Sequence, residues 1–205
     1  MQHIELPTEL TGRRLTACFT GCRPKNLFGY EKEPYWPLVK CLTDIVLDLH
    51  RQGVDRFISG GAQGFDQLAF WGVDRAKRNE TGIINDVYVP FPAQPSRWKR
   101  TGLFSQTEYG LMLGKADHVR TLADDPDPSE FYQAVQRLHG RNHAMVADSD
   151  LVIALLVEGH NTNWQTAKGG TAECVRYARS QNVPVLAVVY TPGAAQPFQT
   201  KLLTA

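Results

Sequence analysis

The sequence predicts an α/β fold built on a doubly wound, mainly parallel sheet with helices on both faces. Strand-length apolar runs alternate with segments of helical periodicity along the chain, which is the pattern of repeated strand–helix–strand units. The strongest strand signals, LTACFT at Leu15–Thr20 and DLVIALLV at Asp150–Val157, are continuous apolar runs. Such runs are typical of strands that helices cover on both faces. We therefore expect one domain over residues 1–205, with its core at about 14–191 between a polar N-terminal segment and a short C-terminal tail.

Local turn and periodicity signals predict the individual elements. Gly21 ends the first strand, and Gly60 and Gly61 end the second. DDPDPS at Asp124–Ser129 predicts a turn-rich hinge, and the residues past Thr191 carry no strong signal. The expected strands are Leu15–Thr20, Val54–Ser59, Asp86–Val89, His118–Leu122, Asp150–Val157 and Val183–Tyr190. The expected helices, with apolar residues three and four apart, are Trp36–Arg51, Phe65–Arg78, Ser105–Ala116, Glu130–Ala147 and Thr171–Ser180.

Composition and charge limit the function classes. Lysine and arginine total 22 against 21 acidic residues, so the net charge of +1 supplies no field that would collect nucleic acid or an anionic membrane. No apolar run approaches the roughly 20 residues of a membrane-spanning helix. The four cysteines form no C-x-x-C pair, and the polar N-terminus shows no secretion signal. We expect a cytoplasmic protein without membrane association, with nucleic acid not favoured as a partner and a homo-oligomer left open.

The first candidate ligand-binding motif is SGGAQGFD, Ser59–Asp66. It follows a predicted strand directly, and Gly60, Gly61 and Gly64 lead into a helix. Backbone N–H groups at a helix N-terminus attract phosphate or another anion, and side chains at the glycines would hold such a ligand away. Asp66 falls in the first helical turn, where it either accepts a hydrogen bond from a ribose hydroxyl or simply favours the positive helix end. A tight strand-to-helix turn without a ligand explains the glycines equally well.

The second candidate motif is KGGTAE, Lys168–Glu173. It follows a polar loop after the most apolar strand and opens a helix. Thr171 either caps that helix with its hydroxyl or donates to a phosphate, and Lys168 either pairs with the same anion or faces solvent. In sheets of this type, two glycine turns at the carboxyl ends of strands bound the usual ligand crevice. The coincidence of both turns favours a nucleotide-type ligand over two unrelated turns.

Arginines near the two motifs are further candidates. Gly21 and Arg23 lie in GCRP after the first strand, where Arg23 either forks onto a phosphate or carboxylate or is a surface arginine. Arg141 and Asn142 lie on a predicted helix, and Asp148 follows Arg141 by two helical turns. Arg141 therefore either contacts the ligand or forms an ion pair with Asp148 that fixes the helix.

Four blocks of sequence occur in order over Leu15–Tyr190, nearly the whole chain. They are FTGCRP with LFGY, SGGAQGFDQLA, PFPAQPSRWKRTGLFSQTEYGLMLGKAD, and RNHAMVADSDLVIALL followed by KGGTAECVRYA. Together they resemble the SLOG superfamily, a nucleotide-binding group that includes DprA/Smf proteins and LOG-type enzymes, and most of all its YspA/YpsA-like branch. The resemblance implies a Rossmann-like sheet with a pocket for a nucleotide or a nucleotide-derived ligand such as ADP-ribose.

The resemblance also implies roles for individual residues. LOG phosphoribohydrolases carry the pattern G-G-x-G-T-x-x-E, and its glutamate position is Cys174 here, one residue after Glu173. Because one residue rotates a helical side chain by about 100°, the Glu173 carboxylate is aimed elsewhere. By position, the phosphate would be held by Gly60, Gly61, Gly64, Gly169, Gly170 and Thr171, and the pocket would be lined by Arg23, Gln63, Asp66 and Glu173.

These observations lead us to expect a sensor or regulator that binds a nucleoside phosphate or an ADP-ribose- or NAD-like ligand and requires no cofactor. The first alternative is a nucleotide N-glycosidase or phosphoribohydrolase, in which Glu173 or Asp66 would stabilise an oxocarbenium-like state. The second is DprA-like handling of single-stranded DNA, which the basic residues in 97–100 keep open. His139 and His143 lie four apart on a predicted helix, but no third ligand accompanies them, so we expect no metal site.

Overall fold

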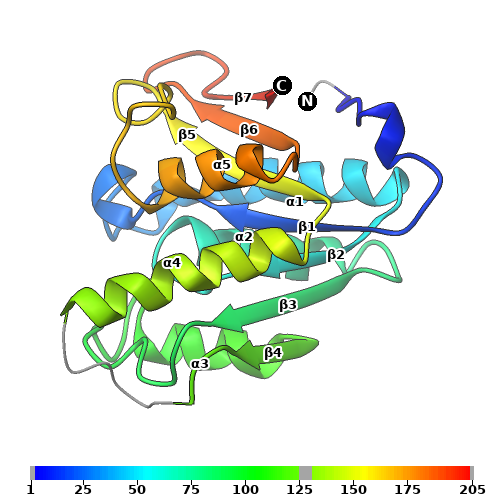
Figure 1. The fold of residues 1–205 in the computed structure, drawn as a ribbon. Helices are drawn as coiled ribbons and strands as arrows, with labels where there is room; N and C mark the ends of the chain where they lie inside the picture. The colour runs from blue at the N-terminus through cyan, green and yellow to red at the C-terminus, as the bar shows by residue number, and fades with distance from the viewer. Residues whose placement is uncertain (1–2, 125–130, 204–205) are drawn as a thin grey trace.

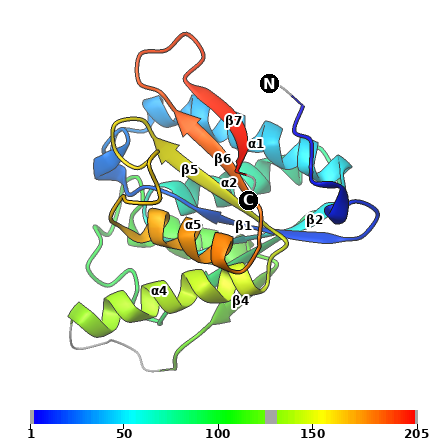
Figure 2. The same cartoon turned by 45° about the horizontal axis from the view of Figure 1, so that its top comes forward.

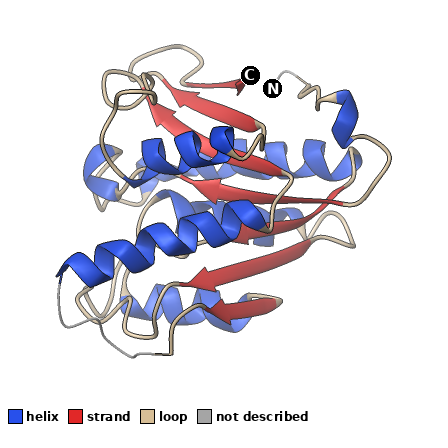
Figure 3. Cartoon of the chain, in the orientation of Figure 1, coloured by secondary structure: helices blue, strands red, loops and turns tan. Residues whose placement is uncertain are grey.

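The computed structural model describes residues 3–124 and 131–203 and confirms the α/β class, with strands and helices alternating along most of the chain (Figures 1 and 3). The predicted elements agree with the observed ones to within two residues at each end. The strands are β1 Leu15–Thr20, β2 Val54–Ser59, β3 Ile84–Val89, β4 His118–Thr121, β5 Leu151–Val157, β6 Val185–Tyr190 and β7 Phe198–Leu203. The helices are α1 Trp36–Arg51, α2 Phe65–Ala76, α3 Gln106–Lys115, α4 Phe131–Ala147 and α5 Gly170–Ser180.

All seven of these strands belong to one sheet, in the order β4-β3-β2-β1-β5-β6-β7. Neighbouring strands are parallel, except for the antiparallel pair β6 and β7. From β1 the chain continues to β2 on one side, whereas β5 pairs with the other side of β1 and leads on to β6. The strand order therefore reverses between β1 and β5. In open α/β sheets, the crevice at the carboxyl ends of such strands is the usual place for a ligand.

Helices cover both faces of the sheet, as a doubly wound fold requires. The layer of α1, α2 and α3 lies on one face, and α4 and α5 lie side by side on the other (Figures 1 and 2). Successive strand residues point to opposite faces, so Phe57 joins the core beneath α1 and α2 while Ile58 joins the core beneath α4 and α5. Within residues 3–124 and 131–203, no helix combines the length and the apolar character that a membrane crossing needs.

The sheet extends beyond the predicted core. Residues 198–203 form β7, which the sequence did not predict because FQTKLL mixes polar and apolar residues. Its first four residues alternate between partly buried and exposed, which fits an edge strand packed on one face only. The N-terminal segment also contributes to the core rather than only flanking it, since Ile4 and Leu10 are buried. Of the predicted hinge at Asp124–Ser129, the residues after Asp124 lie outside the described part of the chain.

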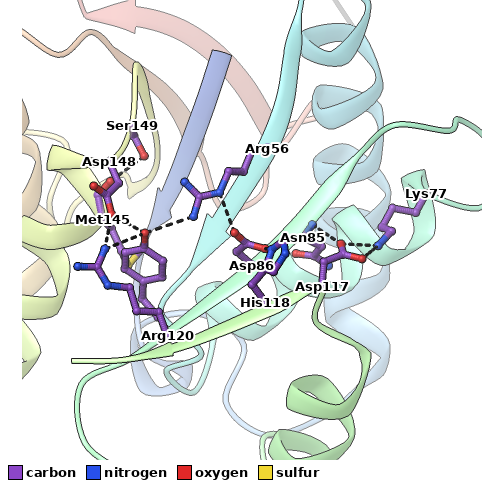
Figure 4. Close-up of polar contacts among 11 residues, drawn as sticks. Arg56, Lys77, Asn85, Asp86, Asp117, His118, Arg120, Met145, Asp148 and Ser149 are labelled. Atoms are coloured by element: carbon purple, nitrogen blue, oxygen red, sulfur yellow. Dashed lines mark hydrogen bonds and ion pairs between the residues drawn. The ribbon is translucent and has the colours of Figure 1, made fainter. Parts of the chain in front are cut away.

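β4 is an exposed edge strand, and polar contacts attach it to the rest of the sheet (Figure 4). Just before β4, Asp117 accepts a hydrogen bond from Lys77 Nζ of the α2 end at 2.7 Å. On β3, the buried Asp86 carboxylate accepts a hydrogen bond from Arg56 Nε at 2.7 Å and lies 2.9 Å from His118 Nδ1. Because all four residues of β4 are exposed, these ion pairs and the backbone ladder take the place of apolar packing.

Replacing Asp117 with Asn tests this attachment. Burial raises the pKa of the Asp117 carboxyl, but hydrogen bonds from Lys77 and from the Asn85 N–H outweigh burial, and the pKa lies below its ordinary value. A carboxyl with a lowered folded-state pKa stabilises the protein above the pKa of the unfolded chain, and this stabilisation is lost as the pH falls through the folded-state pKa. We expect Asp117→Asn to lower the free energy of unfolding by about 1 kcal/mol at pH 7, and by progressively less below about pH 4.

Urea unfolding at neutral pH and at about pH 3 measures this difference. The matched control is Asp44→Asn, which breaks an exposed ion pair with Lys40 one turn away on α1. The control substitution should change the free energy of unfolding by less than about 0.5 kcal/mol. An Asp117→Asn effect of equal size at both pH values would contradict a stabilising role for the ionised carboxylate.

Candidate functional site

A cavity of about 350 Å³ opens at the carboxyl ends of β1 and β5, where the strand order reverses. The segment after β1 forms one wall, the loop after β5 and the start of α5 form another, and α4 closes the side. Both ribbon views show the loop after β5 beside the segment after β1 (Figures 1 and 2). The lining residues are Thr20, Gly21, Cys22, Arg23, Lys25, Asn26, Ala62, Asp66, Val135, Leu138, His139, Arg141, Asn142, His160, Asn161, Lys168, Gly169, Gly170 and Thr171.

The N-terminus of α5 is open toward this cavity. Gly169 has a φ of 106°, a backbone conformation that favours glycine, and α5 begins at the next residue without a side-chain cap. Among the described residues, nothing lies within 4 Å of the position that a Cβ on Gly169 would take. The first N–H groups of a helix have no intrahelical partner, and the helix dipole adds partial positive charge there. Thr171, predicted as a possible cap, is not the cap, but it does line the cavity.

Besides Arg141 of α4, three cations line the cavity, and they come from both of its facing walls. Arg23 and Lys25 follow β1, and Lys168 precedes α5. Burial lowers the pKa of the Arg23 guanidinium, which still stays charged at neutral pH because its ordinary value is so high. An anion bound at the α5 N-terminus would therefore meet positive charge on two sides.

Asn142 of α4 is a buried polar residue close to the start of α5. It is 9% exposed, and its Oδ1 accepts a hydrogen bond from Arg141 Nε at 3.1 Å. Its Nδ2 lies 3.9 Å from the Cβ position of Gly170 and has no hydrogen-bond partner among the described residues. A ligand atom or a water at this position could accept a hydrogen bond from Nδ2.

The first glycine turn is filled by the protein itself. Arg141 of α4 donates through Nη1 to the Gly60 carbonyl, and the same nitrogen lies 3.3 Å from Asp66 Oδ2. A Cβ on Gly60 would overlap this nitrogen, so glycine is needed to leave room for the guanidinium. Burial raises the pKa of the Asp66 carboxyl, and the positive charges of Arg141 and Arg23 oppose that rise. This glycine is thus explained by an internal contact rather than by a phosphate.

The N-terminus of α2 is occupied as well. The Phe65 N–H donates to the Cys22 carbonyl at 3.1 Å, and the Ala62 N–H donates to Asp66 Oδ2 at 3.4 Å. Gly64 has a φ of 95°, and a Cβ there would lie 2.6 Å from the Cys22 oxygen. The segment after β1 is therefore docked on the turn where a phosphate was expected. Burial raises the pKa of the Cys22 thiol to about 11, so the thiol is protonated at neutral pH and is no nucleophile.

The ion pair between Arg141 and Asp148, one of the two alternatives that the sequence left open, is not formed. Asp148 accepts a hydrogen bond from Arg120 Nη1 at 2.6 Å, while Arg141 is committed to Gly60 and Asp66. Two helical turns separate Arg141 from Asp148 along α4 and its end, and the two side chains find partners on β4 and on the first glycine turn instead. Arg141 therefore fixes α4 to the sheet, but through a different carboxylate.

The structure divides the predicted ligand-binding residues into two groups. One group lines the cavity and the other does not. In the group outside the cavity, Gln63 donates to the Phe104 carbonyl at 2.7 Å, and Gly61 packs against Tyr109 and Met112 of α3. The residues that line the cavity are Gly21, Arg23, Asp66, Arg141, Asn142, Lys168, Gly169, Gly170 and Thr171. Those that do not line it are Ser59, Gly60, Gly61, Gln63, Gly64 and Glu173.

Several lining residues escaped sequence reasoning. Lys25 follows β1, and His160 and Asn161 follow β5, in polar loops at the carboxyl ends of the two central strands. Their position after the central strands could have identified them, because loops at this edge carry the ligand contacts in open α/β sheets. His139 had been considered only as a metal ligand, yet it lines the cavity.

Glu173 faces α4 rather than the cavity, as the displaced sequence position predicted. Its Oε2 lies 3.0 Å from His139 Nδ1, and its Oε1 lies 2.6 Å from His143 Nε2. Cys174, the next residue, is 2% exposed and belongs to the core beneath α4 and α5. Within residues 3–124 and 131–203, no group of three or more His, Cys, Asp and Glu residues is arranged to hold a metal ion.

A larger cavity, of about 700 Å³, lies over α1, α2 and residues 103–108. It contains none of the predicted site residues and no carboxyl end of a strand. One of its cations, Arg78, is paired with Asp74 at 2.9 Å. This cavity exceeds the one at β1 and β5 in volume, but position in the sheet and chemistry favour the cavity at β1 and β5, which we take as the candidate site.

Replacing Arg141 with Met tests the internal role of the first glycine turn. The Arg141 and Asp66 side chains are 5% and 8% exposed, so removing one partner leaves an uncompensated buried charge. We expect Arg141→Met to lower the free energy of unfolding by about 3–5 kcal/mol, measured by urea unfolding. Adding Asp66→Asn to this variant should recover part of the loss. If the double variant is no more stable than Arg141→Met, the buried pair does not have this role.

Comparison with known proteins supports the resemblance seen in the sequence. Residues 17–191 match the YspA SLOG family, a range that runs from β1 to just beyond β6 and includes every lining residue of the cavity. The chain is also 30% identical over 131 residues to the uncharacterized SPbeta prophage-derived protein YoqJ of Bacillus subtilis strain 168. That alignment covers 60% of this chain and 69% of YoqJ. The chain therefore belongs to the YspA SLOG family.

Proposed function

We propose that this protein binds a nucleotide or a nucleotide-derived ligand in the cavity between β1 and β5 and acts as a sensor or regulator. The observation that carries the proposal is the uncapped N-terminus of α5, which opens into the cavity with the free Asn142 amide beside it. Helix N-termini of this kind bind phosphate through backbone N–H groups and the helix dipole. The phosphate of the ligand is expected at Gly169, Gly170 and Thr171.

The charge of the cavity supports an anionic ligand. Four cationic side chains line it, Arg23, Lys25, Arg141 and Lys168, against the single carboxylate of Asp66. The whole chain has a net charge of only +1, so positive charge is concentrated at this site. A cleft lined by one sign of charge raises the local concentration of an oppositely charged ligand.

The volume of the cavity supports a small molecule. Ligand pockets generally occupy roughly 300–1,000 Å³. The present cavity, about 350 Å³, lies at the lower end of that range and suits a ligand of mononucleotide size or part of a dinucleotide. A role in binding is favoured over phosphoribohydrolase activity of the LOG type, because the Glu173 carboxylate is bonded to α4 rather than exposed to the cavity.

Calorimetric titration with AMP and with ADP-ribose tests this proposal. Lys168→Gln removes a cation beside the proposed phosphate and should weaken binding about fivefold, the equivalent of about 1 kcal/mol. Lys99→Gln, which changes another exposed lysine outside the cavity, is the matched control and should leave the affinity unchanged.

Two results would contradict the proposal. One is the absence of binding of both AMP and ADP-ribose to the folded protein. The other is an equal loss of affinity in the Lys168→Gln and Lys99→Gln variants, which would assign the interaction to diffuse surface charge. An oligonucleotide of single-stranded DNA serves as a further probe, and salt-sensitive binding of it in preference to the nucleotides would favour the DNA-handling alternative.

A further inference from the structure

A carboxylate–imidazole pair borders the cavity on its α4 side. α4 and α5 pack side by side (Figures 1 and 2), and Glu173 in the first turn of α5 reaches across to two histidines of α4. His139 Nδ1 lies 3.0 Å from one carboxylate oxygen, and His143 Nε2 lies 2.6 Å from the other. The two histidines are one helical turn apart, so a single carboxylate holds both rings.

Only one of the two histidines borders the cavity. His139 lines it and also lines an adjoining cavity that Glu173 borders. His143 lines neither cavity, and its ring stacks on Tyr177 of α5 with the ring centroids 3.7 Å apart. Because Nδ1 of His139 is hydrogen-bonded to Glu173, the Nε2 edge of the ring is the one left for the candidate-site cavity, and no hydrogen bond within the described residues engages it.

The position of His139 relates it to the phosphate end of the cavity. Lys168 and Gly169 line the same two cavities as His139, so the ring stands beside the N-terminus of α5. Of these two cavities, Asp66 lines only the candidate site, and the Ala62 N–H of the first glycine turn donates to its carboxylate. A proton donor beside the anion-binding end of the helix is placed to protonate the leaving oxygen of a P–O bond. It is not placed to assist cleavage of the bond between the sugar and the base.

We propose that His139 is a general acid for hydrolysis of a phosphoester bond in the nucleotide-type ligand, with Glu173 as its positioning residue. The inference rests on the proposed function, because it needs a ligand whose phosphate lies at the α5 N-terminus. A carboxylate bonded to Nδ1 fixes the orientation of an imidazole and stabilises its protonated form, which leaves Nε2 to exchange a proton with the substrate.

The proposed step needs only water as co-reactant. A water oxygen forms a bond to phosphorus as the bond from phosphorus to the leaving oxygen breaks, and the electron pair of that bond stays with the leaving oxygen. His139 Nε2 donates its proton to the leaving oxygen, giving a hydroxyl on the departing fragment. The proton released from the attacking water returns to the imidazole, so the ring ends in its starting state.

Phosphorus NMR of the wild-type protein with AMP, 2′,3′-cyclic AMP or ADP-ribose, in the presence of EDTA, tests this activity. We expect hydrolysis of at least one of the three compounds. His139→Asn keeps an amide nitrogen for Glu173 but removes Nε2, and it should lower kcat about 100-fold or more. His118→Asn changes a histidine that pairs with a different carboxylate, Asp86, outside the cavity, and should keep the wild-type rate.

Glu173→Gln and His139→Gly separate the chemical role from a structural one. Glu173→Gln should lower kcat while leaving KM and the calorimetric affinity for AMP unchanged, because Glu173 does not line the cavity. Added imidazole should restore part of the activity of His139→Gly, a rescue that a merely structural role of the ring would not show.

The outcomes distinguish this inference from the proposed function. Binding without hydrolysis of all three compounds, or equal rates in wild type and His139→Asn, would overturn the acid role and leave the binding proposal intact. Release of adenine instead of cleavage at phosphorus would overturn it in favour of a glycosidase. Activity that EDTA abolishes and zinc restores would assign the histidines to a metal ion and likewise overturn it. Absence of any binding would overturn both proposals.

Discussion

The contact of the Arg141 guanidinium with Gly60 and Asp66 is the interaction on which the rest of the site depends. It joins α4 to the turn after β2 and to the first turn of α2, and the two contacted residues are 81 and 75 positions away in the sequence. Arg141 and Asp66 are both buried, so each of the two charges depends on the other for part of its stabilisation. The glycine at position 60 is required by the volume of the guanidinium.

This contact gives the two glycine turns different tasks. The first turn accepts Arg141 at Gly60 and the Cys22 carbonyl at Phe65, so its polar groups are satisfied within the protein. The second turn, at Gly169 and Gly170, has no such partner among the described residues and opens into the cavity. Of the two glycine turns, the second is therefore the one that, among the described residues, presents a helix N-terminus without a side-chain cap to the cavity.

The sequence predicted best those elements that are deeply buried, because burial requires apolar residues at helical or strand spacing. α1 has a fully buried stripe that includes Leu38, Leu42 and Leu49, and β5 is buried throughout, so helical and strand periods are plain in the residues themselves. β7 was missed because an edge strand needs only one packed face, so its residues show no clear strand pattern. Its strand conformation comes from antiparallel pairing with β6, which is a long-range contact. Local patterns do not reveal such long-range partners.

The candidate site was predictable to the same extent. The cavity's place at the carboxyl edge followed from the order of strands and turns, and Lys168, Gly169 and Gly170, which the sequence predicted as ligand contacts, line it. The role of Gly60 was not predictable, because a glycine that admits an arginine and a glycine that admits a phosphate look alike in sequence. The pairing of Glu173 with His139 likewise depends on the packing of α5 against α4, which no spacing within either helix encodes.

Amide NMR spectra recorded during titration with AMP test this division of tasks most directly. If the open turn binds the phosphate, the backbone amide signals of Gly169, Gly170 and Thr171 will shift in proportion to occupancy, while those of Gly60 and Gly61 will stay near their free positions. Saturable shifts confined to Gly60 and Gly61, with the α5 amides unchanged, would show that the first turn is the phosphate site and would contradict the central role of Arg141 in filling it.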